Sequence, residues 1–254
     1  MERTMRTAGL MGKLPKKHSP KTLDFNKYLL PGIPPAPMKT YWEYKIPDDA
    51  WNMFKNDSIG DCTCAAIAHM LMLTTVHTGK IVIPTEQDVL DAYTAVSGYD
   101  QQTGANDNGA VIVDVLNYWQ THGIAGHKIL GWAEIDQTDL EKMKQGIYIF
   151  GGVDLGANMP QSSMDQFESH KPWRVADSAT DIIGGHSFPV FGYGRAGETC
   201  VTWAERQQIN WAWHTKYVDE AYVVITNDWI NEASGLAPNA LNLDQLQTDI
   251  KAIT

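Results

Sequence analysis

The apolar positions between residues 62 and 78 recur at the spacing of one helical face. A polar, turn-forming run that ends in Gly60-Asp61 precedes them, and Gly79 follows them as a C-cap. We therefore predict a helix that begins at Cys62. The apolar residues on this face are Ala66, Ile67, Met70, Leu71 and Leu73.

Two further helices are predicted before residue 123. Thr85-Glu86-Gln87-Asp88 resembles a capping box, with an Asp where Glu or Gln is usual, and apolar residues follow it at helical spacing as far as Val96. A third apolar stripe runs from Ala110 to His122, and Gly123 ends it. The chain up to this point is therefore predicted to be mostly helical.

From about residue 129 the pattern changes to short β-prone runs, which a short helix from Asp139 to Lys144 interrupts. Helices first and strands second is the pattern of an α+β fold. We predict a helical half, about residues 46–128, packed on an antiparallel β half, about residues 129–230. The β-prone runs cover residues 129–132, 147–155, 186–193, 199–203 and 221–226.

The two ends of the chain differ from this body. Residues 1–45 hold six prolines and scattered lysines, which predicts an extended or irregular arm. Residues 231–254 form a C-terminal tail. The apolar residues of the arm indicate that it lies on the body, on a second copy or on a protein partner; they are Leu29, Leu30, Ile33, Tyr41 and Trp42.

The net charge and the cysteines indicate which kinds of protein this chain does not resemble. A net charge of −10 over 254 residues lacks the basic face that nucleic-acid or anionic-membrane binding needs. The three cysteines show neither disulfide-framework nor zinc-site spacing, so we expect a reducing compartment, no metal and no other cofactor. The first 20 residues lack the apolar stretch of a signal peptide, and no segment has the length of a membrane span. We expect a soluble, cytoplasmic protein.

Cys62 and His186 are the candidate reactive pair. At a helix start, unpaired backbone N–H groups and the helix dipole favour the nucleophilic thiolate, whereas the neighbouring Asp61 opposes it. His186 follows Gly184-Gly185, which lets another chain approach, and the β-prone run behind it holds the imidazole on a rigid strand. Taken singly, each residue is more often a buried structural side chain. Together they fit a Cys–His pair across a cleft between the two halves.

The order of these motifs resembles that of the papain-like cysteine peptidases. The run from Asn56 to Cys62 is similar to the family's Gln-x3-Gly-Ser-Cys motif, and Asp107-Asn108-Gly109 to its "CNGG" loop. The run from Gly185 to Tyr193 is similar to its "GHAVLVVGY" strand. Further pieces in the family's order are Ile46 to Trp51, Pro84 to Val96, Leu140 to Leu155 and Tyr222 to Ile225.

Two groups of related proteins share further motifs with the chain. The Asp61-Cys62 pair, with a polar amide six positions before the Cys, resembles the leader peptidases of bacteriocin exporters. An uncharacterised set of papain-like proteins in phages and bacteria shares "NDxxGDC", "NYWQxxG", "LGW" and "VTW…KY" with this chain. That likeness supplies no function, although it makes association with a virion the alternative to a free cytoplasmic protein.

The resemblance implies a role for each matched residue. Cys62 would attack a carbonyl, His186 would move the proton, and Asn56 with the Cys62 backbone N–H would bind the oxyanion. Asn108 and Gly109 would line the substrate cleft. Asn56 replaces the family's Gln, so it could equally shape the turn only, with Asp57 as the alternative donor position if the register slips.

The remaining departures concern the histidine. Val201 stands where the family has the Asn that orients the imidazole, and Val cannot form a hydrogen bond. Thr202, one residue on, carries a hydroxyl that can accept from the ring N–H farther from Cys62, while Trp203 would shield that contact from water and border the substrate site. Pro189 removes a backbone donor, so its strand should carry a bulge or lie at a sheet edge.

Two functions remain open from the sequence. The first is a papain-like thiol hydrolase that acts on a peptide or amide substrate. The second is a non-catalytic papain-like protein with a binding or structural role, for which the phage proteins above make association with a phage one option. Such a protein keeps the fold but not the chemistry. Because the arm is short and Pro-rich, it does not resemble the helical inhibitory propeptide of the family, and we expect no activity control by proteolytic maturation.

Overall fold

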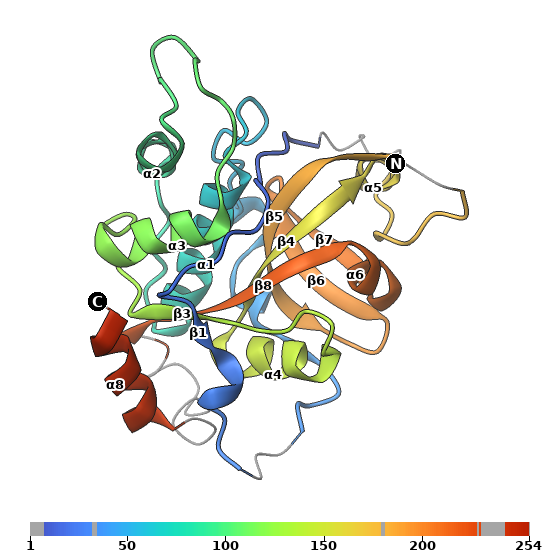
Figure 1. Ribbon diagram of the computed structural model, residues 1–254. Helices are drawn as coiled ribbons and strands as arrows, with labels where there is room; N and C mark the ends of the chain where they lie inside the picture. The colour runs from blue at the N-terminus through green and yellow to red at the C-terminus, as the bar shows by residue number, and fades with distance from the viewer. Residues whose placement is uncertain (1–7, 32–34, 179–180, 228, 230–241, 254) are drawn as a thin grey trace.

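The computed structural model describes residues 8–31, 35–178, 181–227, 229 and 242–253. One twisted sheet forms its centre, and the helical half lies against one face of that sheet (Figure 1). The predicted α+β architecture, with a helical half packed on a mostly antiparallel β half, is confirmed.

The helical half consists of α1 (Cys62–His77), α2 (Glu86–Ser97) and α3 (Ile112–Thr121). α1 begins at Cys62, as its apolar spacing predicts. Thr85 and Asp88 form the predicted capping box at the start of α2, and Gly98 closes that helix in a left-handed conformation. α1 is buried almost all round, because α2 and α3 pack on it from one side and the sheet from the other.

The strands lie in the order β1-β3-β8-β4-β5-β6-β7, with β2 paired to β5. β1 and β3 are parallel and the other neighbouring pairs are antiparallel. The strands are β1 (Leu23–Asp24), β2 (Thr40–Tyr41), β3 (Gly131–Glu134), β4 (Val153–Pro160), β5 (Ile182–Tyr193), β6 (Gly197–Thr202), β7 (Glu205–Asn210) and β8 (Val218–Ile225).

Side-chain alternation along β8 assigns the two faces of the sheet. Tyr222 and Val224 join the apolar cluster under α1, whereas Val223 and Ile225 join the cluster on the opposite face. That opposite face is covered by α4 (Leu140–Phe150) and α6 (Trp211–Tyr217). The sheet is therefore buried on both sides at its centre.

Part of the β half differs from the sequence prediction. The apolar run from residue 147 begins as the end of α4, and the strand starts only at Val153, because Met143, Ile147 and Phe150 form a helical stripe packed on the sheet. The predicted helix from Asp139 to Lys144 is the first part of α4, with Asp139 as its N-cap. The sequence analysis missed β7, α6 and α5 (Gln161–Glu168).

β5 carries His186 and lies inside the sheet, between β4 and β6. Its register against β6 shifts between Val190 and Gly192, directly after Pro189. The sequence predicted either a bulge or an edge position for Pro189, and the structure shows the bulge. Proline has no backbone N–H to donate to a neighbouring strand, and a shift in register accommodates it inside the sheet.

One stretch of the N-terminal arm, from Leu23 to Tyr28, contributes side chains to the core. Leu23 and Phe25 are buried, and Phe25 packs edge-on against Phe150 of α4 with ring centroids 5.9 Å apart. Of the apolar residues predicted to anchor the arm, Leu29 and Trp42 pack against the core, whereas Tyr41 is 45% exposed. Leu30 is half-buried, and Ile33 lies outside the described residues.

The C-terminal segment contains α8 (Leu243–Ile253), which packs next to the arm. Its Leu246 and Ile250 enter the core, and Asp249 accepts a hydrogen bond of 2.8 Å from the Tyr28 hydroxyl. Cys62, Cys64 and Cys200 are buried and form no disulfide with one another. None of the described helices combines the length and apolar character needed to cross a membrane.

Replacing Phe25 should show how far the arm stabilises the body. Phe25→Ala removes a ring that is 1% exposed, so we expect the free energy of unfolding to fall by about 3–5 kcal/mol. Met38→Ala, at a side chain that is 89% exposed, is the control on the same arm and should change it by less than about 0.5 kcal/mol. Chemical denaturation measures both, and equal stability of the two variants would mean that the arm only rests on the surface.

Candidate active site

Cys62 and His186 line the same small cavity. Cys62 is the first residue of α1 and His186 lies on β5, and these two elements pack directly against each other. The cavity has a volume of only about 10 Å³, and each of the two residues is 1% exposed. The two residues that the sequence analysis singled out therefore border one narrow, enclosed space.

The imidazole of His186 is held by two neighbours. The Thr202 hydroxyl lies 2.7 Å from Nε2, and the Trp203 ring stacks on the imidazole with centroids 4.5 Å apart and an angle of 23°. Trp203 has a φ of 47°, a left-handed conformation that turns its ring back over the histidine. Nδ1 makes no hydrogen bond with any described residue. With Thr202 on Nε2, Nδ1 is the nitrogen that remains for proton exchange with a thiol.

Burial sets the charge state of both groups. It raises the pKa of the Cys62 thiol to about 12, and Asp61 and Asp154 raise it further, whereas the backbone N–H groups of Ser187 and Gly12 act against this rise. Burial also lowers the pKa of His186 to about 3. The expected stabilisation of thiolate by the helix start is therefore outweighed, and near neutral pH the pair is a neutral thiol and a neutral imidazole.

Residues 8–14 of the arm, which we name the covering segment, lie across the site. Leu10 donates its backbone N–H to the Asn56 carbonyl at 2.6 Å, and Lys13 donates to the Gly185 carbonyl at 2.9 Å. Between them, the carbonyl of Gly12 accepts from Ala110 at 2.8 Å. The covering segment therefore forms backbone hydrogen bonds with the loop before Cys62, with β5 and with the residues just before α3.

Glycines on both sides permit this close fit. A Cβ on Gly12 would lie 1.7 Å from the Gly60 carbonyl oxygen, and a Cβ on Gly109 would lie 2.1 Å from the Gly12 carbonyl oxygen. A Cβ on Gly185 would lie 2.3 Å from the Lys13 carbonyl oxygen. The chain that Gly184-Gly185 was predicted to admit is thus the protein's own arm. The covering segment contains no helix, as expected, yet it covers the cysteine as an inhibitory segment would.

The other predicted site residues are divided between the cavity and its rim. Asn56 borders the cavity, and its amide donates to the carbonyl oxygens of Ile59 at 3.2 Å and Leu10 at 3.1 Å. It therefore shapes the turn and at the same time binds a carbonyl of the covering segment. Gly109 contacts that segment, whereas the Asn108 side chain is exposed on the adjoining loop. Asp57 is exposed as well.

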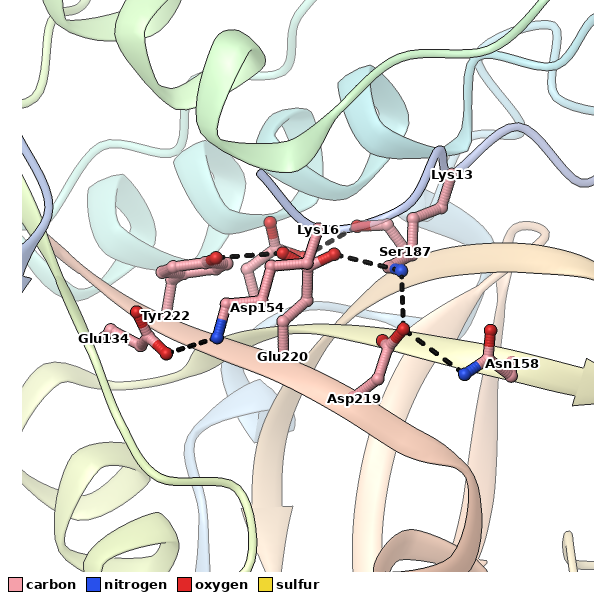
Figure 2. A network of polar contacts seen from close by, with 9 residues as sticks. All are labelled: Lys13, Lys16, Glu134, Asp154, Asn158, Ser187, Asp219, Glu220 and Tyr222. Carbon is pink, nitrogen blue, oxygen red and sulfur yellow. Dashed lines mark hydrogen bonds and ion pairs between the residues drawn. The ribbon is translucent and has the colours of Figure 1, made fainter. Parts of the chain in front are cut away.

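A second group of polar residues beside the site was missed by the sequence analysis. Lys13 of the covering segment reaches Asp219 and Glu220 at the start of β8, and its ammonium lies 3.0 Å from a carboxylate oxygen of each (Figure 2). Glu220 also accepts from the Tyr222 hydroxyl at 2.9 Å. A lysine in an arm and two acids about 206 positions later give no local pattern, so only the fold brings them together.

Asp154 lies beside this group and connects to β5, the strand that carries His186. Its carboxylate accepts from the Ser187 hydroxyl at 3.0 Å, and Ser187 follows His186 on β5. Burial and the nearby Glu220 raise the pKa of Asp154 to about 8. Within the described part of the chain, no three His, Cys, Asp or Glu side chains are placed to hold a metal ion.

The chain was compared with known protein families, sequences and structures. No family model and no curated protein sequence matches the chain. Xylellain, a cysteine protease from Xylella fastidiosa, superposes with a TM-score of 0.65 at 15% identity, over 89% of this chain and 98% of that one. A procathepsin B from Trypanosoma congolense superposes with a TM-score of 0.56 at 11% identity, over 85% of this chain and 86% of that one. A cysteine protease from Carica candamarcensis superposes with a TM-score of 0.52 at 14% identity, over 75% of this chain and 99% of that one. The chain therefore has the fold of the papain-like cysteine peptidases.

Proposed function

We propose that the protein is a papain-like thiol hydrolase that cleaves a peptide or amide bond with Cys62 and His186. The observation that carries the proposal is the Thr202 hydroxyl at 2.7 Å from Nε2 of His186, in the cavity that Cys62 lines. An oriented base that borders the same cavity as a nucleophile at a helix start supports covalent catalysis by this pair. The structures with the same fold are named as cysteine proteases, which supports the same reaction class.

The chemistry follows from the atoms around the cavity. Nδ1 of His186 takes the thiol proton, and the Cys62 sulfur attacks the substrate carbonyl. Thr202 accepts a hydrogen bond from Nε2–H and so stabilises the imidazolium that forms. The imidazolium then gives its proton to the leaving amine as the C–N bond breaks. Water, deprotonated by His186, hydrolyses the resulting thioester and restores the thiol.

The oxyanion needs hydrogen-bond donors, and the chain offers two. One is the backbone N–H of Cys62 at the start of α1. The other is the Asn56 amide, which in the closed chain already donates to a peptide carbonyl, that of Leu10. A substrate carbonyl in place of Leu10 would receive the same donor, and one donor of this kind lowers a barrier by about 2.7–4 kcal/mol.

Catalysis requires the covering segment to move. In the closed chain the Cys62 thiol is 1% exposed and its pKa is about 12, so a substrate has no access and almost no thiolate forms. Displacement of the segment admits water, which reduces the desolvation that raises the thiol pKa and lowers the imidazole pKa. We therefore propose that the closed chain is a latent state of the enzyme.

Removing the Thr202 hydroxyl should slow turnover without unfolding the protein. Thr202→Val should lower kcat/KM about ten- to a hundredfold, on the order of 1.4–2.7 kcal/mol, because the imidazolium loses its hydrogen-bond acceptor. Thr202→Ser keeps the hydroxyl and should retain activity. The measurement is cleavage of quenched fluorescent peptides across pH, where the Val variant should also show a lower apparent pKa for the histidine. Equal rates and equal pH profiles for all three proteins would exclude Thr202 from the site.

Opening the covering segment should expose Cys62 to alkylation. At pH 7.5 a thiol with a pKa of about 12 is almost wholly protonated, so iodoacetamide should label Cys62 slowly in the parent chain, with a rate that keeps rising with pH above 9. Gly12→Val cannot fit against Gly60 and should raise the rate at pH 7.5 by about a hundredfold or more, with a transition below pH 8.5.

The matched control for this experiment is Leu14→Ala, at an exposed position of the same segment. It should label as slowly as the parent chain, which mass spectrometry of the Cys62 peptide would show. Fast labelling of the parent chain would contradict a latent closed state. Fast labelling of Gly12→Val without turnover of any peptide or amide would favour the non-catalytic binding protein.

A further inference from the structure

We propose that Asp219 and Glu220 form a pocket that selects a lysine or arginine side chain of the substrate, and that Lys13 occupies this pocket in the closed chain. We name these two residues, with Gly156 and Asn158 beside them, the acidic pocket. The proposal rests on the proposed hydrolase function and adds its substrate class: peptides with a basic residue next to the bond that is cleaved or close to it.

The fit of Lys13 shows that the pocket is built for a long cationic side chain. The Lys13 side chain is 1% exposed, and its ammonium lies 3.0 Å from Asp219 and 3.0 Å from Glu220. A Cβ on Gly156 would lie 2.2 Å from Cε of Lys13 and 2.6 Å from the Glu220 side chain. The missing side chain at Gly156 therefore provides the room through which the lysine reaches the carboxylates.

The carboxylates are held in place by groups other than the lysine. Glu220 accepts from the Tyr222 hydroxyl at 2.9 Å, and Asp219 accepts from the Asn158 amide at 3.3 Å (Figure 2). Asp154 lies next to Glu220, fully buried, and one of its carboxylate oxygens has no hydrogen-bond partner among the described residues. An oxygen of Asp219 also has no hydrogen-bond partner among the described residues. Asp219 and Glu220 therefore form a preorganised pair of acids, and a cation placed between them, as the Lys13 ammonium is, offsets the cost of their burial.

The position of the pocket relative to the nucleophile makes it a substrate pocket. Lys13 directly follows Gly12, and the backbone N–H groups of both donate to the carbonyl of Gly185, the residue before His186, at 2.9 Å for Lys13 and 3.2 Å for Gly12. Gly12 also lies near enough to Cys62 for its backbone N–H to lower the pKa of the thiol. An open groove of about 420 Å³ continues from Lys13 and Asp219 along Asn158 and the exposed side chains of Ile182 and Ile183. A peptide that replaces the covering segment over Cys62 therefore passes this pocket and this groove.

The competing explanation is that Lys13 only fastens the arm to the body. Both explanations predict that loss of Lys13 loosens the covering segment, so that result alone decides nothing. They differ in what the empty pocket does with a free cation, because a fastening ion pair has no reason to accept a separate ligand. The experiment therefore uses the full chain with Lys13→Ala, which leaves the acidic pocket empty.

The first measurement is the labelling of Cys62 in the Lys13→Ala chain by two peptidyl acyloxymethyl ketones that differ only in lysine or norleucine. We expect the lysine probe to label Cys62 at least about tenfold faster, since norleucine has the same length but no charge. Asp219→Asn in the same background should reduce that ratio below about threefold, because the lysine probe loses one of its two carboxylates. Equal rates for the two probes, or a faster norleucine probe, would overturn the proposal.

The second measurement does not depend on the arm opening. Butylammonium chloride should raise the Tm of Lys13→Ala by filling the vacant pocket, and butanol at the same concentration should not. The parent chain and Lys13→Ala/Asp219→Asn are the controls and should show no such rise. Lys16 lies on the same arm as Lys13 and forms an exposed ion pair with Glu134 of β3. Lys16→Ala removes that ion pair and should behave like the parent chain. No specific effect of butylammonium would contradict a cation pocket, whatever the labelling shows.

The outcomes separate this proposal from the proposed function. If iodoacetamide alkylates Cys62 in Lys13→Ala but the peptidyl probes show no preference for lysine, the acidic pocket is not a substrate pocket, and the hydrolase can still act on other peptides. If the lysine probe is preferred and no peptide or amide is turned over, the pocket stands and the hydrolase does not.

Discussion

The packing of α1 against β5 is the constraint on which the rest of the structure depends. It places the first residue of a helix from one half beside a histidine on a strand from the other half. Because both elements are buried, neither can shift without opening the apolar cluster beneath α1, in which Ile67 and Phe191 are fully buried. A rigid helix and a rigid strand hold the thiol and the imidazole where loops alone could not. The bulge after Pro189 adjusts β5 without moving it to the sheet edge.

The same burial works against the chemistry until the site opens. Burial strengthens the hydrogen bond between His186 and Thr202, but it also favours the neutral forms of the thiol and the imidazole. The nearby acidic residues do not offset the effect of burial on the thiol, since Asp61 and Asp154 both raise its pKa further. Burial raises the pKa of Asp61 itself, which favours its neutral form and weakens its opposition to a thiolate. Entry of water is therefore the step that would turn a structural cysteine into a nucleophile.

The parts that could be predicted from sequence are those with local signals. The helix start at Cys62, the capping box at Thr85 and the glycines before His186 are each specified within a few residues. The run at residues 147–150 was misassigned because its β-prone residues also fit a helical stripe, and packing on the sheet decided between the two. Lys13 and its acidic partners could not be predicted, since they lie about 206 positions apart and only the path of the arm joins them.

Closure and recognition use the same groups, and this limits how the site can change. The Asn56 amide, the Gly185 carbonyl and the acidic pocket all bind the covering segment in the closed chain. Under the proposed function a substrate peptide uses these groups in turn, so the segment and the substrate compete for one set of hydrogen bonds and one pair of carboxylates. A substitution in the body that strengthens binding of a basic substrate also strengthens binding of Lys13. The gain in substrate affinity is then cancelled by the tighter closure of the covering segment. Selectivity between the two can therefore change only through the arm itself, where Lys13 and the glycines of the covering segment determine how strongly it closes the site.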